Sequence, residues 1–425
     1  MIQVRRIENP KGVWRSAGKS DNFHVTLMRL PYDNAEDFKP FNSEGAWRAT
    51  IIDGGDDFIT LRSTVEGSGS DNVQQTGVKS IEGAGEHPID FWIDFKGTIP
   101  EGATPRCAIV RVRYHNYTCE HDIFVRQGYA PITINGNAES NNNPAWTSYN
   151  VYRFDANNAP VYTKSPLEEG SLFRRGNRTA ILASNNDRSG FTFGVEPTGS
   201  FNVLEFGSAT TSQKTWSQLA PSTDDVTNRF KEWSIAGDHE RIATIEDFYT
   251  LESTSIHSNI NKAYGVLYGD GATETQKSVK EAFGYDHNED PTNSKKGMRG
   301  CFVFNVNNSR NIFFPIGKSG YGRRKGMTSN GEKVGTLRYA QRTDYYNNDG
   351  TGNIQYVPLF YDLFERPGAI YQCRNRLEST NNEVKNSSAF DINYFTMGFE
   401  GFENGASNNN NGSDSDACFI RTVKY

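Results

Sequence analysis

Apolar and polar residues alternate with a period of two through the first part of the chain, which is the pattern of strands with one buried face. Val110 and Val112 share one face of an extended segment, and Arg111 and Arg113 share the other. The short stretch HNYT then separates two such runs at hairpin length. We therefore predict an antiparallel β-sandwich over residues 1–128. Its strands are AWRATIID, DFITLRS, IDFWIDF, RCAIVRVRYH and EHDIFVRQ.

The pattern changes after Gly128. Residues 129–148 are rich in Asn, Gly and Pro, so they are expected to form a linker to a second domain over 149–425. That second part contains the two helices that the sequence predicts. The first covers 244–264, where Thr244 and Asp247 have the spacing of a capping box. The second begins near Thr273 and ends at Gly284. Strands follow them: GCFVFNV, NIFFPI, GTLRYAQR, GAIYQCRN, FDINYFTMGF and ACFIRTVKY.

Composition supports this mainly β fold class with an α+β C-terminal part. The chain has 425 residues, enough for two domains, and aromatic residues make up 12% of it. The formal net charge of −6 provides no general attraction for nucleic acid, so we expect no nucleic-acid partner. No apolar run reaches the roughly 18 to 20 residues that span a bilayer. Met1 leads directly into a polar segment, and we expect that an export signal has been removed.

Several local patterns come close to known functional motifs without matching them. Gly317-Lys318-Ser319 resembles the end of a phosphate-binding loop, but Ile312 occupies the position that needs the first glycine. A zinc site formed by His115, Cys119 and His121 would have no fourth ligand, and the spacing of these residues matches no known zinc motif. No nucleophile elbow is present, and paired carboxylates cannot be assigned to a hydrolase geometry. We predict a protein that is not an enzyme. The cysteines, Cys107, Cys119, Cys301, Cys373 and Cys418, are five in number and irregularly spaced, so at most two disulfides could form.

One polar and aromatic stretch in the second domain suits ligand binding. The segment TDYYNNDG combines tyrosine rings with amide and carboxylate groups, and Arg323 and Arg324 in an earlier basic turn could bind an anion. The alternative is that the tyrosines pack against their own domain and that the basic turn is simply hydrated. The predicted ligand-binding residues are Asp344, Tyr345, Tyr346, Asn347, Asp349, Arg323 and Arg324.

Four short motifs in the second domain occur in the order found in C-type-lectin-like domains. They are Arg241-Ile242-Ala243-Thr244 before a helix, Gly368-Ala369-Ile370-Tyr371, Ala389-Phe390-Asp391-Ile392-Asn393-Tyr394, and Ile420-Arg421-Thr422-Val423-Lys424 at the end. Together they resemble the motifs of the major-paralogous-domain and sulfatase-modifying-factor families. The disulfide of those families is absent, since the corresponding positions hold Ala236 and Thr422. The stretch RCAIVRVRYHNYTCEHDIFVRQG resembles the last hairpin of the immunoglobulin-like, BACON-type domains in surface lipoproteins of Bacteroides-type bacteria, which implies an immunoglobulin-like sandwich over residues 1–128.

The combined resemblance is to a fimbrial tip or cell-surface adhesion protein of those bacteria. It implies an extracellular location at the outer membrane, with the membrane contacted only through an N-terminal lipid anchor. It also implies a host or bacterial surface glycan or protein as ligand, and pilin subunits as further partners. No cofactor is expected; a calcium-dependent sugar site is the alternative, since Glu196-Pro197-Thr198 and residues 289–293 come close to the calcium motif of sugar-binding lectins. The competing functions are a structural pilus-assembly subunit and a sulfatase-modifying-type enzyme that uses Cys301 or Cys373.

Overall fold

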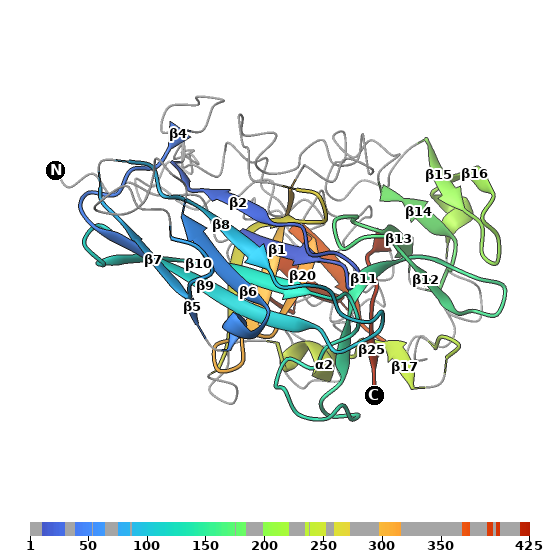
Figure 1. Ribbon diagram of the computed structural model, residues 1–425. Helices are drawn as coiled ribbons and strands as arrows, with labels where there is room; N and C mark the ends of the chain where they lie inside the picture. Colours follow the sequence, from blue (N-terminus) through green and yellow to red (C-terminus); the bar gives the residue numbers. More distant parts are fainter. Residues whose placement is uncertain are drawn as a thin grey trace, which may run out of the picture. The chain divides into compact units, whose positions relative to one another are not determined.

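The computed structural model confirms a mainly β protein (Figure 1). Its strands belong to two compact units, which are described separately: unit 1 comprises Met1–Ala138 and Ser253–Phe314, and unit 2 comprises Glu139–Glu252 and Pro315–Tyr425. In the part of the chain that the structure describes, no helix is long and apolar enough to cross a membrane. The described residues are 11–29, 39–52, 54–63, 75–85, 87–174, 176–183, 199–220, 234–237, 239–251, 259–272, 297–315, 368–374, 389–393, 397–399 and 417–425.

Unit 1 is built on an eight-stranded sheet in the order β20-β19-β18-β1-β10-β9-β5-β7. In Figure 1 this order runs from the orange and yellow strands of the second segment to the blue and cyan strands of the first. A three-stranded sheet, β2-β8-β6, and the pair β3-β4 complete the unit. The strands are β1 (Lys11–Arg15), β2 (Phe23–Thr26), β3 (Met28–Arg29), β4 (Lys39–Pro40), β5 (Trp47–Ile52), β6 (Ile59–Ser63), β7 (Ser80–Gly83), β8 (Asp90–Phe95), β9 (Arg106–Tyr114), β10 (Cys119–Gln127), β18 (Ile260–Tyr268), β19 (Met298–Asn305) and β20 (Asn311–Pro315), with a 3-10 turn η1 (Gly55–Asp57).

The two sheets of unit 1 pack face to face around an apolar core. The Trp47 ring of β5 lies 6.2 Å from the Phe91 ring of β8, and Phe23 of β2 lies 5.4 Å from Tyr268 of β18. Strand β8 alternates between half-buried and buried residues along its length, as the period-two pattern predicts for a strand with one wet face. The alternation in the sequence therefore determines which polar side chains lie on the solvent-exposed faces of the sheets.

One strand of unit 1 departs from the predicted antiparallel arrangement. Strand β1 runs parallel to both of its neighbours, β10 and β18. Through this pairing, residues 253–314 belong to the first compact unit. From the sequence we expected them in a second domain, after a linker at 129–148. The pairing joins Lys11 to Val266, and no local pattern encodes a contact between positions so far apart.

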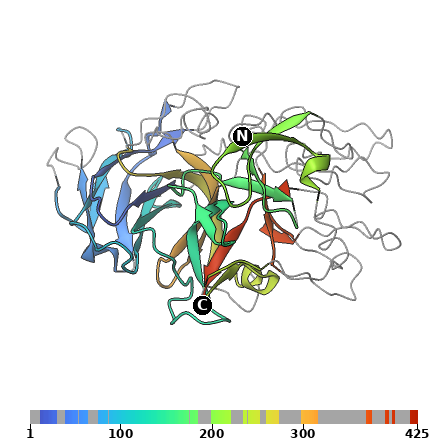
Figure 2. The ribbon, with the colours of Figure 1, turned by 90° about the vertical axis from the view of Figure 1, so that its right-hand side faces the viewer.

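Unit 2 contains three small sheets, in the orders β12-β11-β25-β17, β16-β15-β14-β13-β24 and β21-β22-β23. Figure 2 shows the red C-terminal strand β25 beside the green β11, its partner in the four-stranded sheet. The elements are β11 (Ala145–Phe154), β12 (Pro160–Tyr162), β13 (Ser171–Arg174), β14 (Ala180–Leu182), β15 (Ser200–Leu204), β16 (Thr211–Thr215), η3 (Ser217–Leu219), β17 (Glu240–Ile242), α2 (Ile245–Tyr249), β21 (Gly368–Gln372), β22 (Ala389–Asn393), β23 (Met397–Phe399), β24 (Ala417–Cys418) and β25 (Arg421–Lys424).

The predicted start of the first helix is confirmed, but its predicted length is wrong. The Thr244 side chain accepts a hydrogen bond from the Asp247 backbone, and the Asp247 side chain accepts one from the Thr244 backbone. The helix α2 nevertheless ends at Tyr249, and the stretch from Ile260 onward forms strand β18. Pairing with β19 over eight residue pairs outweighs the weak helical spacing of the apolar residues there. The second predicted helix lies outside the described residues.

Candidate functional site

The predicted ligand-binding residues all fall outside the described residues, so their arrangement stays a prediction. These are Asp344, Tyr345, Tyr346, Asn347, Asp349, Arg323 and Arg324. Glu196-Pro197-Thr198 and residues 289–293, the near matches to a calcium motif, also lie outside them. The candidate site described below is therefore in unit 1.

The site is built around the turn between β9 and β10, which holds three consecutive residues in the left-handed region. His115, Asn116 and Tyr117 have φ angles of 52°, 54° and 66°. Such a conformation costs about 1–3 kcal/mol for each non-glycine residue and persists only where surrounding contacts enforce it. Here the His115 backbone N–H donates to Ser43 Oγ at 2.8 Å, and the Asn116 N–H donates to the Ala46 carbonyl at 3.0 Å.

The turn side chains complete this attachment to the loop of residues 42–46. The Ala46 N–H donates to Asn116 Oδ1 at 3.1 Å, and Asn116 Nδ2 donates to the Glu44 carbonyl at 3.4 Å. The Glu44 N–H donates to His115 Nδ1 at 2.8 Å, so a neutral His115 ring carries its proton on Nε2. A turn held by this many hydrogen bonds presents a rigid surface.

A hollow of about 530 Å³ lies against the same loop. It is lined by Asn42–Ala46 and by Ala84 and Gly85, which follow strand β7. Gly85 has no room for a side chain, because a Cβ there would overlap the Gly45 nitrogen and the Ser43 carbonyl oxygen. Gly45 has a φ of +90°, and a Cβ there would overlap the Asn116 side chain. Polar groups and backbone, rather than large apolar side chains, therefore shape this hollow.

Charged side chains cross the wet face of the sheet beside the hollow. One row contains Glu82, Arg48, Arg113 and Glu120, on strands β7, β5, β9 and β10. Arg48 forms an ion pair with Glu82, and Arg113 Nε lies 3.1 Å from Glu120 Oε2. In the next row, Arg111 forms a two-pronged pair with Asp122 at 2.9 and 3.1 Å. The arginines thus lie on β5 and β9, and their acidic partners lie on the two flanking strands, β7 and β10.

Tyr117 completes the surface. Its side chain is 41% exposed, and the Arg48 guanidinium carbon lies 5.1 Å from the centre of its ring. We call the whole assembly the hairpin end: it consists of residues 42–46, 84–85 and 115–118 together with Arg48 and Arg113. The connections that form it meet at one edge because β5 is antiparallel to both β7 and β9.

Beneath the hairpin end lies an aromatic floor. Tyr114 packs edge-on against Phe41 at 5.2 Å, and Phe41 also contacts the His115 ring at 5.3 Å. Burial, with a smaller contribution from Cys119, raises the pKa of the Tyr114 hydroxyl to about 12. No cluster of three or more His, Cys, Asp or Glu residues able to hold a metal occurs in the described part of the chain. The hairpin end is suited to binding through hydrogen bonds and charge.

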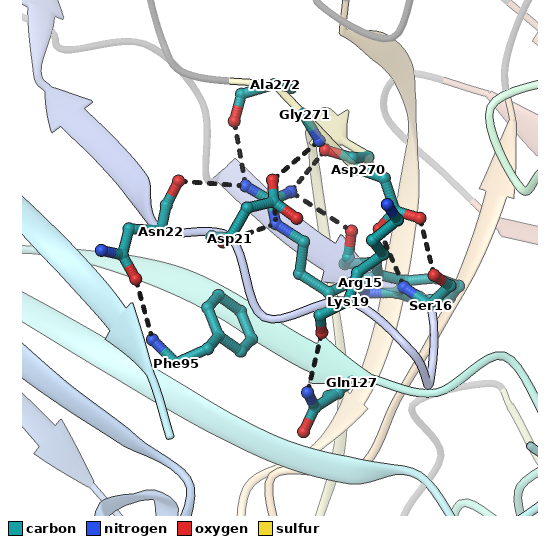
Figure 3. Close-up of polar contacts among 12 residues, drawn as sticks. Arg15, Ser16, Lys19, Asp21, Asn22, Phe95, Gln127, Asp270, Gly271 and Ala272 are labelled. Atoms are coloured by element: carbon teal, nitrogen blue, oxygen red, sulfur yellow. Dashed lines mark hydrogen bonds and ion pairs between the residues drawn. The ribbon is translucent and has the colours of Figure 1, made fainter. Parts of the chain in front are cut away.

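A second polar network in unit 1 has a different character (Figure 3). The buried Arg15 guanidinium donates to the carbonyls of Gly269, Ala272 at 2.9 Å and Asp21 at 2.9 Å. The Asp21 carboxylate lies 3.1 Å from Arg15 Nε. Burial lowers the pKa of Arg15, while Asp21 and Asp270 act in the opposite direction. Figure 3 shows the guanidinium enclosed between the loop after β1 and the loop after β18.

Asp270 strengthens this connection from the other side. Its two carboxylate oxygens accept from the Ser16 backbone N–H at 2.9 Å and from the Ser16 hydroxyl at 2.7 Å. The Gly271 N–H donates to the Asp21 carboxylate at 2.8 Å. Because its donors and acceptors serve neighbouring segments of the same unit, the network is a structural connection between the two sequence segments of unit 1.

None of the five cysteines forms a disulfide. Cys301, Cys373 and Cys418 are buried, and Cys107 and Cys119 are half-buried. Thr422, at one of the half-cystine positions of the families named above, instead joins a hydrogen-bond network, donating to Glu240 Oε1 at 2.8 Å.

Comparisons with known proteins provide little further information. No family model matches the chain, and a search of curated proteins finds no match. One solved structure with some similarity is the sialic acid binding region of the Streptococcus sanguinis SK1 adhesin bound to 3'sLn. It is 10% identical, with a TM-score of 0.15, over 73% of this chain and 76% of that chain. A likeness this weak carries no argument about fold or function.

Proposed function

We propose that the protein is an exported cell-surface adhesin that binds a glycan or protein ligand without a catalytic step. The observation that supports this most is the strained turn His115–Asn116–Tyr117, held by hydrogen bonds to residues 42–46 beside a hollow. Left-handed backbone in three successive non-glycine residues is expensive and is concentrated in proteins at ligand-binding and catalytic sites. A rigid scaffold that carries such a pre-formed end is the usual arrangement of a recognition protein.

Two regions are candidates for the ligand contact under this proposal. The hairpin end is supported by its geometry in unit 1. The tyrosine-rich segment Asp344–Asp349 with Arg323 and Arg324 is supported by its residue types alone. A lectin-like second domain, fimbrial attachment and an outer-membrane lipid anchor belong to the same proposal and follow from the motif resemblance.

The test is an array of glycans and extracellular-matrix proteins, probed with the full chain in calcium and then in chelator. We expect binding to at least one class of ligand. Tyr117→Ala and a Tyr345→Ala/Tyr346→Ala double variant then separate the two regions, with Gln213→Ala on the exposed strand β16 as the control. Binding lost only in Tyr117→Ala assigns the contact to the hairpin end. Binding lost with chelator supports the calcium alternative, and absence of binding throughout would remove the adhesin proposal.

A structural role in pilus assembly is the second candidate. Strand β7 forms one edge of the eight-stranded sheet, and an edge strand can accept a strand from a neighbouring subunit. Mixing the full chain with purified pilins and measuring complex formation by size-exclusion chromatography tests this role. If no complex forms, this candidate is eliminated.

A further inference from the structure

We infer that the hairpin end binds an acidic saccharide, with Arg48 and Arg113 holding its carboxylate or sulfate group and Tyr117 contacting its ring. The inference rests on the proposed recognition function and names the class of ligand. The starting observation is that Arg48 and Arg113 lie opposite each other on neighbouring strands. Their mutual repulsion is unfavourable in the protein alone, and a bound anion would offset it.

Arg48 and Arg113 face each other directly across strands β5 and β9. Opposed side chains in an antiparallel pair have Cβ atoms about 4.5–5.5 Å apart, and like charges there are destabilising. The two side chains are 47% and 53% exposed, so both guanidinium groups reach solvent. An anion seated between them would be attracted by both positive charges at once.

Their existing ion pairs leave capacity for such an anion. Arg48 contacts Glu82 through Nη2, and Arg113 contacts Glu120 through Nε. A guanidinium carries five N–H donors, more than one carboxylate can accept. The three arginines of this face, at positions 48, 111 and 113, are balanced by Glu82, Glu120 and Asp122. The face therefore has no net positive charge, and an anion would be attracted because Arg48 and Arg113 are the two inner members of their row.

The neighbouring groups favour a saccharide over an acidic peptide. Tyr117 offers a partly exposed ring, and aromatic rings contact sugars through their apolar C–H faces. The residues that line the hollow of about 530 Å³ include Asn42 and the exposed Glu44, whose side chains can exchange hydrogen bonds with hydroxyl groups. Glu44 would repel a second acidic side chain of a peptide but can accept from a sugar hydroxyl.

Unit 1 offers a matched control on its smaller sheet. Arg62 also lies over an aromatic ring, 4.8 Å from the Trp92 centre, and also forms an ion pair. It differs in two ways. Its guanidinium holds Asp94 with two hydrogen bonds, at 2.9 and 3.0 Å, and its cross-strand neighbour is Trp92 rather than a second arginine.

The experiment measures affinity of the full chain by calorimetry for four probes: a sulfated disaccharide, a disaccharide carrying only a uronic-acid carboxylate, neutral lactose, and a glutamate-rich peptide. We expect binding of one or both acidic disaccharides that weakens with added salt. The Arg48→Gln/Arg113→Gln double variant should lose about tenfold or more in affinity, since it removes both charged donors to the anion. Arg62→Gln should bind like the parent.

The probe that binds distinguishes sulfate from carboxylate recognition. Equal affinity of the double variant and the parent, tighter binding of lactose, or binding of the peptide alone would each overturn the inference. Each of these would leave the broader adhesin proposal intact if the glycan and matrix array is positive. If the parent chain binds nothing on the array and none of the four probes, both the saccharide inference and the adhesin proposal are overturned. Unchanged thermal melting of the double variant shows that any loss of affinity is not a loss of folding.

Discussion

Unit 1 uses arginine in two opposite ways. Arg15 is buried, and backbone carbonyls from two distant segments accept its hydrogen bonds. Arg48 and Arg113 are half-exposed, each with one acidic partner on a neighbouring strand. A buried guanidinium with fixed partners holds a fold together, whereas exposed guanidiniums with donors to spare can serve a ligand. The contrast predicts that stability depends on the first and binding on the second.

The largest expected effect tests the buried side of this contrast. Arg15→Ala removes the donor to the carbonyls of Gly269 and Ala272 and the ion-pair partner of the Asp21 carboxylate. Each buried carbonyl that loses its donor typically costs about 1–3 kcal/mol of stability, and this substitution affects two of them. Urea denaturation followed by tryptophan fluorescence should show this as a lower midpoint. A midpoint equal to that of the parent chain would contradict the structural role.

Gly85→Ala should give the next largest effect, because the added Cβ meets backbone atoms of Ser43 and Gly45 on the wall of the hollow. Backbone cannot move aside as a flexible side chain can, and overpacking of this kind costs about 1–3 kcal/mol. Gly18→Ala is the control, since a Cβ at Gly18 meets nothing within 4 Å. Equal melting temperatures for the two variants would show that the hairpin end is not rigid.

Arg48→Gln should change stability by less than about 0.5 kcal/mol, because exposed ion pairs contribute little and the substitution also removes a like-charge opposition. Its midpoint in the same urea experiment should match that of the parent. A loss comparable with that of Arg15→Ala would mean that the exposed arginines are structural after all, and the contrast between the two sites would disappear.

The smallest effect at neutral pH concerns the floor of the hairpin end. Burial raises the pKa of Tyr114 to about 12, so the folded state favours the neutral hydroxyl. The associated stability is present below the ordinary tyrosine pKa of about 10 and is lost as the pH rises towards 12. The pKa values of Tyr152 and Tyr371 are raised by burial as well, so alkaline titration of tyrosinate absorbance should show several late-titrating groups, one of which is missing in Tyr114→Phe. Its persistence in that variant would contradict the assignment.

The sequence predicted those features that local patterns encode. The alternation along residues 107–115 correctly predicted which face of β9 is buried and which is exposed. The spacing of Thr244 and Asp247 correctly predicted where a helix begins. The strand pairing of β1 with β18 could not be predicted, because it depends on packing between distant segments. The opposition of Arg48 and Arg113 likewise depends on register between β5 and β9. The alternating arginines of β9 were the only sign of it in the sequence.

The position of β1 also has a consequence for synthesis. Lys11 pairs with Val266, 255 positions later, and unit 2 begins within the intervening stretch and ends after it. At about 5–20 residues per second, a ribosome needs on the order of tens of seconds to make that stretch. During this time the nascent β1 has one bare edge and the buried Trp14 lacks its distant hydrogen-bond partner Asn311. We therefore expect this chain to depend on holding chaperones during translation more than a protein of the same size whose domains follow one another.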